Sequence, residues 1–266
     1  MQKILKHFYE NLSTDLVNKL PDPTNKFGMD SVKEYYSKFD LQNEKFKFQP
    51  ATETMVHLLL EGINPDKAVG IDNMTGRFLK DGSEILKKPI TQLINLSIRT
   101  SKFPDGCKIA KLKPLHKKGS FLEPKNYRPI SLLPIVSKLF EKIIHDQTQQ
   151  YLDEKKILYT YQSGFRAKHS TSTCLSLLQN KILNGFDKGQ LTGMILIDLQ
   201  KAFDTIDHDI FIQKLTHLGF SEDCVSWYKS YLQNRTFVVS IEKEYSNSAS
   251  LLCGVPQGSI LGPLLF

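Results

Sequence analysis

The chain has 266 residues, of which 40% are hydrophobic and 24% charged, and this composition excludes a disordered, collagen-like or coiled-coil protein. Its apolar runs are far shorter than the roughly 18 residues of a membrane helix, and its charged first residues are unlike a signal peptide, so we expect no membrane partner. The formal net charge is +7, and four cysteines dozens of residues apart favour a reducing, intracellular compartment, with nucleus or cytoplasm left open.

The first part of the chain predicts helices joined by polar segments. Apolar residues at helical spacing predict a helix over 1–20, which Pro21 ends, and another over 51–62. We interpret residues 1–65 as a helical N-terminal linker region. A strong amphipathic pattern over 84–101 predicts a third helix.

The most basic part of the chain follows, over residues 101–128, where eight lysines and arginines and two acids give a local net charge of +6. Alternation over 109–116 and a second extended run over 127–133 predict a β-hairpin with lysines on one face, and Pro114 predicts a sheet edge or a bulge. Such a surface suits a polyphosphate partner, either nucleic acid or nucleotide, and a solvated lysine-rich loop is the alternative.

Helices and strands alternate after the hairpin. Apolar spacing predicts helices over 136–144, 170–184, 210–217 and 222–233. A buried strand is predicted over 194–197, and a second hairpin over 236–241 and 249–253. Together these elements predict an α+β fold in which an antiparallel sheet packs on helices.

Asp198 directly follows the apolar run that we interpret as a buried strand. A carboxylate at that position is costly unless a cation or hydrogen bonds meet it. Asp204, Asp207 and Asp209 follow closely, and an oxygen-rich cluster of this kind suits Mg²⁺. In the alternative interpretation, Asp198 caps the next turn and the other three acids are solvated.

A loop rich in glycine and proline, residues 254–263, is the second candidate for a functional feature. Its composition predicts a backbone that comes close to another group, before a helix that starts near Ser259. Gln257 is expected at its tip as a hydrogen-bonding side chain. Taken alone, such a segment is usually only a connection between elements.

Several segments resemble, in the same order, the successive motifs of reverse transcriptases, and the likeness is greatest to those of non-LTR (LINE-type, jockey-like) retrotransposons. The segments are Lys67–Asp72, Lys113–Gly119, Asn126–Leu133, Gln162–Arg166, Ile197–His208 and Gly254–Pro263. The resemblance covers residues 66–266, which we therefore assign to a reverse transcriptase domain. It implies the fingers and a partial palm of a right-hand polymerase, with the thumb absent.

The resemblance also implies roles for individual residues. Asp198 resembles the catalytic aspartate, which would bind Mg²⁺ (or Mn²⁺) together with the Leu199 carbonyl, two ions being needed for nucleotidyl transfer. Phe203 is similar to the aromatic gate against a ribose 2′-hydroxyl. The other residues that match nucleotide-binding positions are Lys113, Lys117, Arg128 and Gln257; those expected to contact nucleic acid are Lys111, Lys118, Lys125, Arg166 and Lys168. We expect structural roles for Asp204 and His208.

These similarities imply an RNA-directed DNA polymerase that extends a DNA primer on an RNA template with deoxynucleoside triphosphates; no protein partner is indicated. The family's aromatic-Ala-Asp-Asp motif would lie beyond Phe266, so we expect a truncated domain without polymerase activity of its own. An inactive nucleic-acid-binding fragment or a decayed element copy is the alternative. We further expect Asp198 and the hairpin over 111–128 to share one cleft, and Leu264–Phe266 to favour aggregation.

Overall fold

The computed structural model describes residues 1–17, 29–39, 41, 45–242 and 244–266. The N-terminal part is helical, as the sequence predicts. The first helices are α1 (Gln2–Val17), α2 (Met29–Tyr36), α3 (Glu53–Glu61), α4 (Gly76–Asp81) and α5 (Ser83–Thr100). The helix predicted over 1–20 is confirmed to residue 17, and residues 18–20 lie outside the described part. Gly62 ends α3 as expected, its N–H bonding to the Leu58 carbonyl.

A small mixed sheet follows these helices. Its strands are β1 (Ile109–His116), β2 (Tyr127–Leu132), β3 (Arg235–Ile241), β4 (Glu244–Tyr245) and β5 (Ala249–Leu251). The order is β2-β1-β3-β4, and β5 also pairs with β3. Both predicted hairpins are confirmed, and so is the α+β class. The sheet is mixed and not purely antiparallel, because β1 and β3 run parallel, Ile109 opposite Thr236.

Pro114 lies in the part of β1 that extends beyond β3. Strand β3 pairs with Ile109–Leu112, whereas Pro114 is opposite Pro129 of β2. A proline there breaks no hydrogen bond to β3, so the missing N–H is tolerated. The prediction of an edge position is therefore confirmed for this half of the strand.

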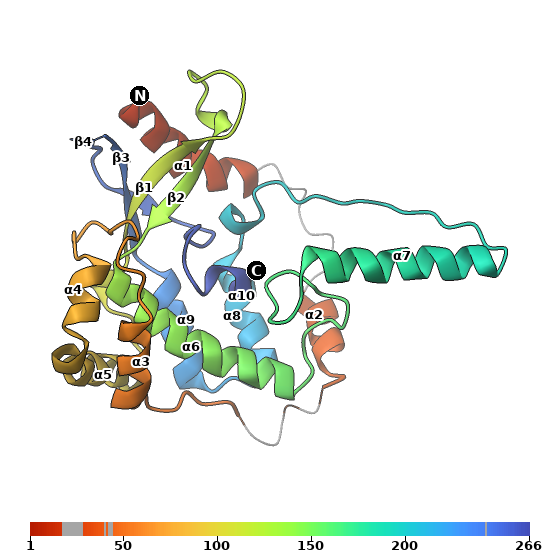
Figure 1. Cartoon of the computed structure of the whole chain (residues 1–266), viewed down its shortest axis with the longest axis horizontal. Helices are drawn as coiled ribbons and strands as arrows, with labels where there is room; N and C mark the ends of the chain where they lie inside the picture. Colours follow the sequence, from red (N-terminus) through yellow and green to blue (C-terminus); the bar gives the residue numbers. More distant parts are fainter. Residues whose placement is uncertain (18–28, 40, 42–44, 243) are drawn as a thin grey trace.

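The larger core lies among the helices that follow the hairpin, α6 (Ile135–Glu154), α8 (His208–His217) and α9 (Glu222–Leu232). Aromatic rings fill it: Trp227 stacks on Tyr231 with centroids 5.8 Å apart and meets Phe103 edge-on at 5.5 Å. The Trp227 Nε1–H donates to Ser97 Oγ of α5 at 2.9 Å, so this buried polar group is satisfied. The bond to Ser97 relates α9 to α5, and the bond between Thr148 Oγ1 and Tyr228 Oη relates α9 to α6 (Figure 1).

A second core lies between α1 and one face of the sheet. Leu5 and Tyr9 of α1 are buried against Leu112 of β1 and Phe237 of β3. Other residues before position 66, such as Val56, belong to the larger core. Residues 1–65 thus contribute to both cores, and the boundary at 65/66 stays a proposal about where the motifs begin. Among the described residues, no helix has the length and apolarity needed to cross a bilayer.

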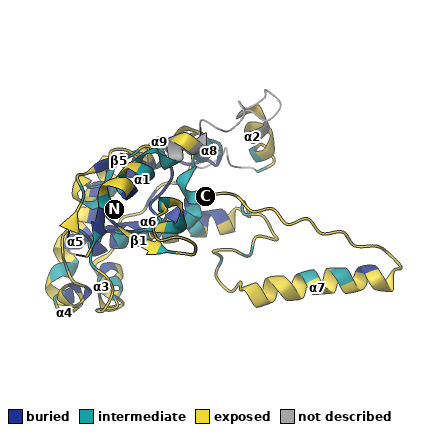
Figure 2. Ribbon diagram, turned by 90° about the horizontal axis from the view of Figure 1, so that it is seen from above, coloured by how far each residue is buried: buried dark blue, intermediate teal, exposed yellow. Residues whose placement is uncertain are grey.

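Residues 170–200 form an arm that projects from the body of the molecule (Figures 1 and 2). It consists of α7 (Thr171–Asp187) and an extended return segment over 190–199. Ser170 caps α7: its side chain accepts the Thr173 N–H, and the Thr173 side chain accepts the Ser170 N–H. Most of α7 is exposed, as Figure 2 shows.

The buried strand predicted over 194–197 is wrong. The residues are extended but pair with no strand in the described part of the chain, and Ile195 and Ile197 are 88% and 83% exposed. A short apolar run is typical of an extended segment. It does not specify the partner strand whose backbone hydrogen bonds would make that segment part of a sheet. Here β1 is already bonded to β2 and β3.

Candidate functional site

Two loops that are far apart in the sequence are joined by hydrogen bonds. The first contains the 3₁₀ turn η4 (Ala202–Asp204), and the second is the glycine-rich loop over 254–261. The Gly254 N–H donates to the Ile206 carbonyl and the Val255 N–H to the Phe203 carbonyl, both at 2.9 Å. His208 Nε2 lies 2.8 Å from the Gly254 carbonyl oxygen. We call this pair of segments the loop junction.

Glycine is required where the second loop passes its neighbours. Gly254 has a φ of +76°, and a Cβ there would lie 2.6 Å from the Phe203 carbonyl oxygen. Gly258 has a φ of +125°, and its Cβ would lie 2.6 Å from the Ser131 carbonyl oxygen of β2. Both the positive φ and the close approach exclude a side chain. The predicted close backbone approach is confirmed, and the partners are η4 and β2.

Gln257 is held at the centre of the loop junction. Its Nε2 donates to both Asp204 carboxylate oxygens at 3.0 Å, and its own carbonyl accepts the Ser131 N–H of β2 at 2.8 Å. Burial raises the pKa of the Asp204 carboxyl, while the Gln257 amide and then Lys201 act in the opposite direction. Asp204 and His208 therefore order loops, as predicted from the sequence.

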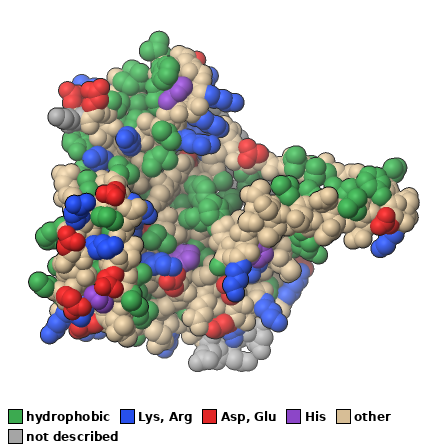
Figure 3. Space-filling model, in the orientation of Figure 1, with side chains coloured by type: hydrophobic (Ala, Val, Ile, Leu, Met, Phe, Trp, Pro, Cys, Tyr) green, Lys and Arg blue, Asp and Glu red, His purple; other side chains and the backbone are tan. Residues whose placement is uncertain are grey.

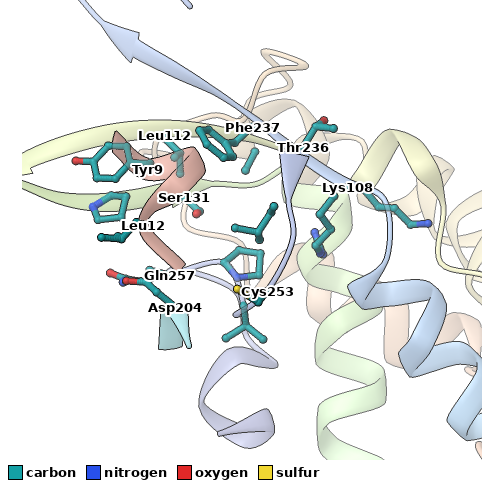
Figure 4. A pocket seen from close by; sticks show the side chains of 16 residues that line it. Tyr9, Leu12, Lys108, Leu112, Ser131, Asp204, Thr236, Phe237, Cys253 and Gln257 are labelled. Atoms are coloured by element: carbon teal, nitrogen blue, oxygen red, sulfur yellow. Dashed lines mark hydrogen bonds between the residues drawn. The ribbon is translucent and has the colours of Figure 1, made fainter. Parts of the chain in front are cut away.

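A cavity of about 40 Å³ lies between α1, the sheet and the loop junction (Figure 4). That volume holds about one water molecule and no nucleotide. Figure 4 shows Tyr9 and Leu12 of α1 on one side of the cavity, with Asp204 and Gln257 close by. Among the described residues, the buried Tyr9 hydroxyl has no hydrogen-bond partner, and burial raises the pKa of Tyr9 well above its usual range. Helix α1 thus closes this face of the sheet.

Phe203 brings a further motif to the loop junction. Its ring is 6.1 Å from that of Phe165, in the basic segment over 162–169, and 5.6 Å from that of Phe266. Phe203 is half-buried. The structure therefore brings together three of the segments that the sequence singled out, through Phe165, Phe203 and Gln257.

The basic residues of the hairpin lie on its other face. Side chains alternate along a strand, so Lys111 and Lys113 point away from the face that carries Leu112. Arg128 is opposite Leu115 and shares the lysine face, whereas Ser131 is opposite Leu112 and lines the cavity. The predicted cationic face is confirmed, but it is not the face that meets Gln257. Figure 3 shows basic side chains gathered beside this hairpin.

The candidate basic residues of the hairpin differ in exposure and in their contacts with other side chains. Lys113, Lys117, Lys118 and Arg128 are exposed on the hairpin and its turn. Lys125 is also exposed but lies 3.0 Å from Glu123, and the Lys111 ammonium lies 5.5 Å from the centre of the Tyr245 ring.

Outside the hairpin, Arg166 is engaged at the C-terminal end of α6. Its guanidinium lies 3.4 Å from Asp153 and donates to the Tyr159 carbonyl at 3.4 Å. Lys168 is exposed, with a φ of +64°. Of these two candidates for template phosphates, Lys168 is the one whose side chain lies open to solvent.

Asp198 and Leu199 lie in the exposed return segment of the arm. The cavity beside Gln257 is lined by Pro129 and Ser131 of β2 but not by Asp198, so the expected shared cleft is not formed by that cavity. Within the described residues, no group of three or more His, Cys, Asp or Glu side chains is placed to hold a metal ion. The described residues thus do not fit a two-metal centre in this conformation.

Sequence reasoning missed Glu141 of α6. Its side chain is 0% exposed, and its Oε2 accepts the N–H of Ile260 in the glycine-rich loop at 2.6 Å. One signal was present: in a helix, positions 140, 141, 144 and 148 share a face, so Glu141 falls within the apolar stripe that includes Phe140 and Ile144.

The comparisons with known proteins agree on one family. Residues 115–266 match the sequence model described as "Reverse transcriptase (RNA-dependent DNA polymerase)". "Probable RNA-directed DNA polymerase from transposon BS" of Drosophila melanogaster is 38% identical over 201 residues, which are 75% of this chain and 22% of that protein. "RNA-directed DNA polymerase from mobile element jockey" of the same species is 32% identical over 197 residues, 74% of this chain and 21% of that protein.

A vertebrate relative aligns with nearly the whole chain. "Transposon TX1 uncharacterized 149 kDa protein" of Xenopus laevis is 24% identical over 264 residues, which are 98% of this chain and 19% of that protein. The chain therefore spans about a fifth of the length of each of these three relatives.

Proposed function

The chain belongs to the reverse transcriptase family, and we propose that it forms the fingers and part of the palm of an RNA-directed DNA polymerase of a non-LTR retrotransposon. In that role it binds a DNA primer on an RNA template and the incoming deoxynucleoside triphosphate. The observation that carries the proposal is the loop junction, where Gln257 binds Asp204, the residue after Phe203.

Phe203 and Gln257 are proposed to contact the incoming nucleotide and the nascent base pair. Their support is geometric: the hydrogen bonds between the two loops set the distance between the ring and the amide. A fixed aromatic ring at this place excludes a ribose 2′-hydroxyl by volume alone. The side-chain amide nitrogen of Gln257 donates to Asp204, so the side-chain oxygen remains to accept a hydrogen bond.

The basic side chains are proposed to bind phosphate groups. Arg128 suits the triphosphate because its planar guanidinium forms two parallel hydrogen bonds to phosphate oxygens, and Lys113 and Lys117 add charge beside it. Lys111, Lys118 and Lys125 are proposed to neutralise the nucleic-acid backbone without reading bases. Arg166 and Lys168 are proposed to meet the template, Lys168 being the more accessible of the two.

Asp198 and the Leu199 carbonyl are proposed as ligands of Mg²⁺, with Mn²⁺ as a substitute. Mg²⁺ keeps several waters and often binds one or two carboxylates together with substrate phosphates, so a single aspartate is compatible with a nucleotide-dependent ion. The support is the position of Asp198 in its motif, five residues before Phe203.

Binding of an RNA–DNA primer–template tests the nucleic-acid part of this proposal. Neutralising about six phosphates should weaken affinity roughly 10³-fold between 50 and 200 mM salt, as measured by fluorescence anisotropy. Lys111→Ala and Lys125→Ala should each reduce the affinity and the salt slope without changing sequence preference. An affinity that does not change with salt would rule out the hairpin as the contact surface.

Binding of dTTP to the primer–template complex tests the nucleotide part. Arg128→Ala should weaken dTTP binding about ten- to a hundredfold, as expected for a lost charge-assisted hydrogen bond, while primer–template affinity changes little. Asp198→Asn should remove the increase in dTTP affinity that Mg²⁺ produces. The alternative, a nucleic-acid-binding fragment, predicts primer–template binding with no Mg²⁺-dependent dTTP binding.

Primer extension tests the polymerase itself. The assay uses an RNA template, a DNA primer and the expressed reading frame that contains residues 1–266. Incorporation that Asp198→Asn abolishes supports the proposal, and Phe203→Ala should then admit ribonucleotides. Incorporation that persists in Asp198→Asn would contradict the assignment of that residue.

A further inference from the structure

Glu141 is the most completely buried acid that contacts the loop junction. Its side chain is 0% exposed, in the middle of α6. Oε2 accepts the Ile260 N–H at 2.6 Å and the Leu261 N–H at 3.4 Å, and Oε1 accepts the Ser137 hydroxyl at 3.1 Å. One side chain of the core helix therefore binds two successive backbone amides of the loop that carries Gln257.

A buried carboxylate costs free energy, and the surroundings of Glu141 offset that cost. Burial raises the pKa of the Glu141 carboxyl, while the nearby Arg235 and the hydrogen bonds from the loop oppose the shift. Arg235 is itself 2% exposed; its Nε donates to the Tyr231 carbonyl at 2.9 Å and its guanidinium lies 4.3 Å from the Tyr231 ring centre. An apolar residue at position 141 would avoid the cost of burying this charge.

The amides that Glu141 binds would otherwise be unsatisfied. Ile260 and Leu261 directly precede the short helix α10 (Gly262–Leu265), and the first N–H groups of a helical turn have no partner within it. Ser259 Oγ satisfies the next one, accepting the Gly262 N–H at 3.0 Å. Glu141 therefore performs the task of a capping residue, but from a different and more rigid element.

The glycine-rich loop is consequently held at three places. Gly254 and Val255 are bonded to the η4 loop, Gln257 is bonded to β2 through its carbonyl, and Ile260 is bonded to α6 through Glu141. The first anchor lies on a loop and the second on a strand of the small sheet. The third lies on a helix packed in the larger core, so it relates the whole loop to the rigid part of the molecule.

We propose that Glu141 is a positioning residue that holds the glycine-rich loop, and Gln257 with it, against the core helix α6 by binding the Ile260 and Leu261 amides. The proposal rests on the function proposed above, in which Gln257 meets the incoming nucleotide. Glu141 touches no substrate in this arrangement and acts only through the loop. Loss of its charge should loosen the loop and weaken nucleotide binding, while the phosphate-binding hairpin and its affinity for primer–template are unaffected.

The test compares Glu141→Gln with Thr148→Val. Glu141→Gln keeps the shape of the side chain but removes its charge. Thr148→Val is the matched control: it lies on the same helix and removes a buried hydrogen bond, between Thr148 Oγ1 and Tyr228 Oη at 2.7 Å, that does not involve the loop. Both variants are expected to lose stability, because each removes buried hydrogen bonding, so stability alone does not distinguish them.

Two measurements do distinguish the variants. The first is the amide ¹H chemical shift of Ile260, which a short bond to a carboxylate moves downfield and which Glu141→Gln alone should move back. The second is dTTP affinity, with Mg²⁺, on an RNA template whose DNA primer ends in a dideoxynucleotide so that no chemistry follows. Glu141→Gln should weaken dTTP binding about tenfold and leave primer–template affinity unchanged, and Thr148→Val should change neither.

The outcomes separate this proposal from the proposed function. If Glu141→Gln leaves both the Ile260 shift and dTTP affinity as in the wild type, the positioning role is overturned. If the wild-type chain binds no dTTP, the proposed function fails, and the Ile260 shift still decides whether Glu141 holds the loop. Should Glu141→Gln not fold, Ser137→Ala removes only the bond to Oε1 and is expected to give the same changes at two- to threefold; no change would overturn the role.

Discussion

The hydrogen bonds between Gln257 and Asp204 show how one acid can organise a substrate-facing loop. Asp204 is half-buried, and both of its carboxylate oxygens accept from the same Nε2. This arrangement fixes which end of the Gln257 amide is free, because the nitrogen faces Asp204 and the oxygen points elsewhere.

The titration of Asp204 gives a pH prediction. Burial raises the folded-state pKa above the unfolded value of about 3.9. The folded protein thus binds the proton at higher pH, and the cost of the buried charge disappears as pH falls through the folded pKa. Relative to Asp204→Asn, the wild-type free energy of unfolding should increase as pH falls from 7 towards 4. Urea unfolding at pH 7, 6, 5 and 4 measures this. The prediction is contradicted if the free energy of unfolding of the wild type minus that of Asp204→Asn stays constant or decreases as pH falls.

Gly258 gives a prediction about backbone conformation. Gly258→Ala places a Cβ at a φ of +125° and 2.6 Å from a backbone oxygen of β2, so the loop must move or the conformation must be strained. We expect a loss of about 1–3 kcal/mol in the free energy of unfolding, measured by urea denaturation. Gly106→Ala is the control, because a Cβ there would meet nothing within 4 Å. Equal effects of the two substitutions would refute the argument.

At the scale of elements, local sequence patterns predicted the type of each element and its buried face, because both depend on residues that are close in sequence. The alternation over 109–116 predicted β1 and its cationic face, and the apolar spacing over 84–101 predicted α5, because each pattern states which face is buried. The parallel pairing of β1 with β3 was not predictable in this way, since the strands are more than 100 residues apart. The run over 194–197 was misinterpreted for the same reason: it has strand character but no specified partner.

The candidate site shows the same limit. Gln257 was predicted because glycine and proline mark its loop, and Asp204 was assigned a structural role without a partner. The partner was unpredictable, because nothing in the two segments states that they meet. Glu141 was missed because a glutamate in a helix is usually solvated, and only its place in the apolar stripe distinguished it.

Helix α7 gives a prediction about local stability. It is largely exposed, so its stability depends on its own backbone bonds and on the Ser170 cap more than on burial. Ser170→Ala should cost about 1 kcal/mol of helix stability, which speeds amide hydrogen exchange within α7 about fivefold. Ser221→Ala, which removes the cap of the buried helix α9, should leave exchange in α7 unchanged. Slow exchange in α7 that neither substitution affects would show that the helix is covered in solution.

At the scale of the whole molecule, apolar surface is concentrated in the arm. Figure 2 shows its residues as mostly exposed, and Figure 3 shows hydrophobic side chains along it. The exposed large apolar residues of the arm are Leu175, Leu177, Leu183, Phe186, Leu191, Met194, Ile195, Leu196, Ile197 and Leu199. In the segment over 264–266, Leu265 is buried and Phe266 is 57% exposed. Unpaired extended segments of this composition favour association between copies.

Light scattering at micromolar concentration tests this. The double variant Ile195→Lys/Ile197→Lys should reduce self-association, because it places two charges in the unpaired apolar segment. Ile85→Lys, at an equally exposed isoleucine on α5, is the control and should have little effect. A wild-type protein that is already monodisperse would contradict the prediction.

The arm also makes the chain divisible. A protease that nicks the backbone near Gly189 would leave two polypeptides, yet the bonds between β1 and β3, between Ser131 and Gln257, and between Glu141 and Ile260 all join one polypeptide to the other. Brief trypsin treatment followed by native mass spectrometry should therefore detect both halves travelling as a single particle. The same halves, expressed separately, should reassemble, which makes residues 189–193 a place to split this fold or to insert a reporter.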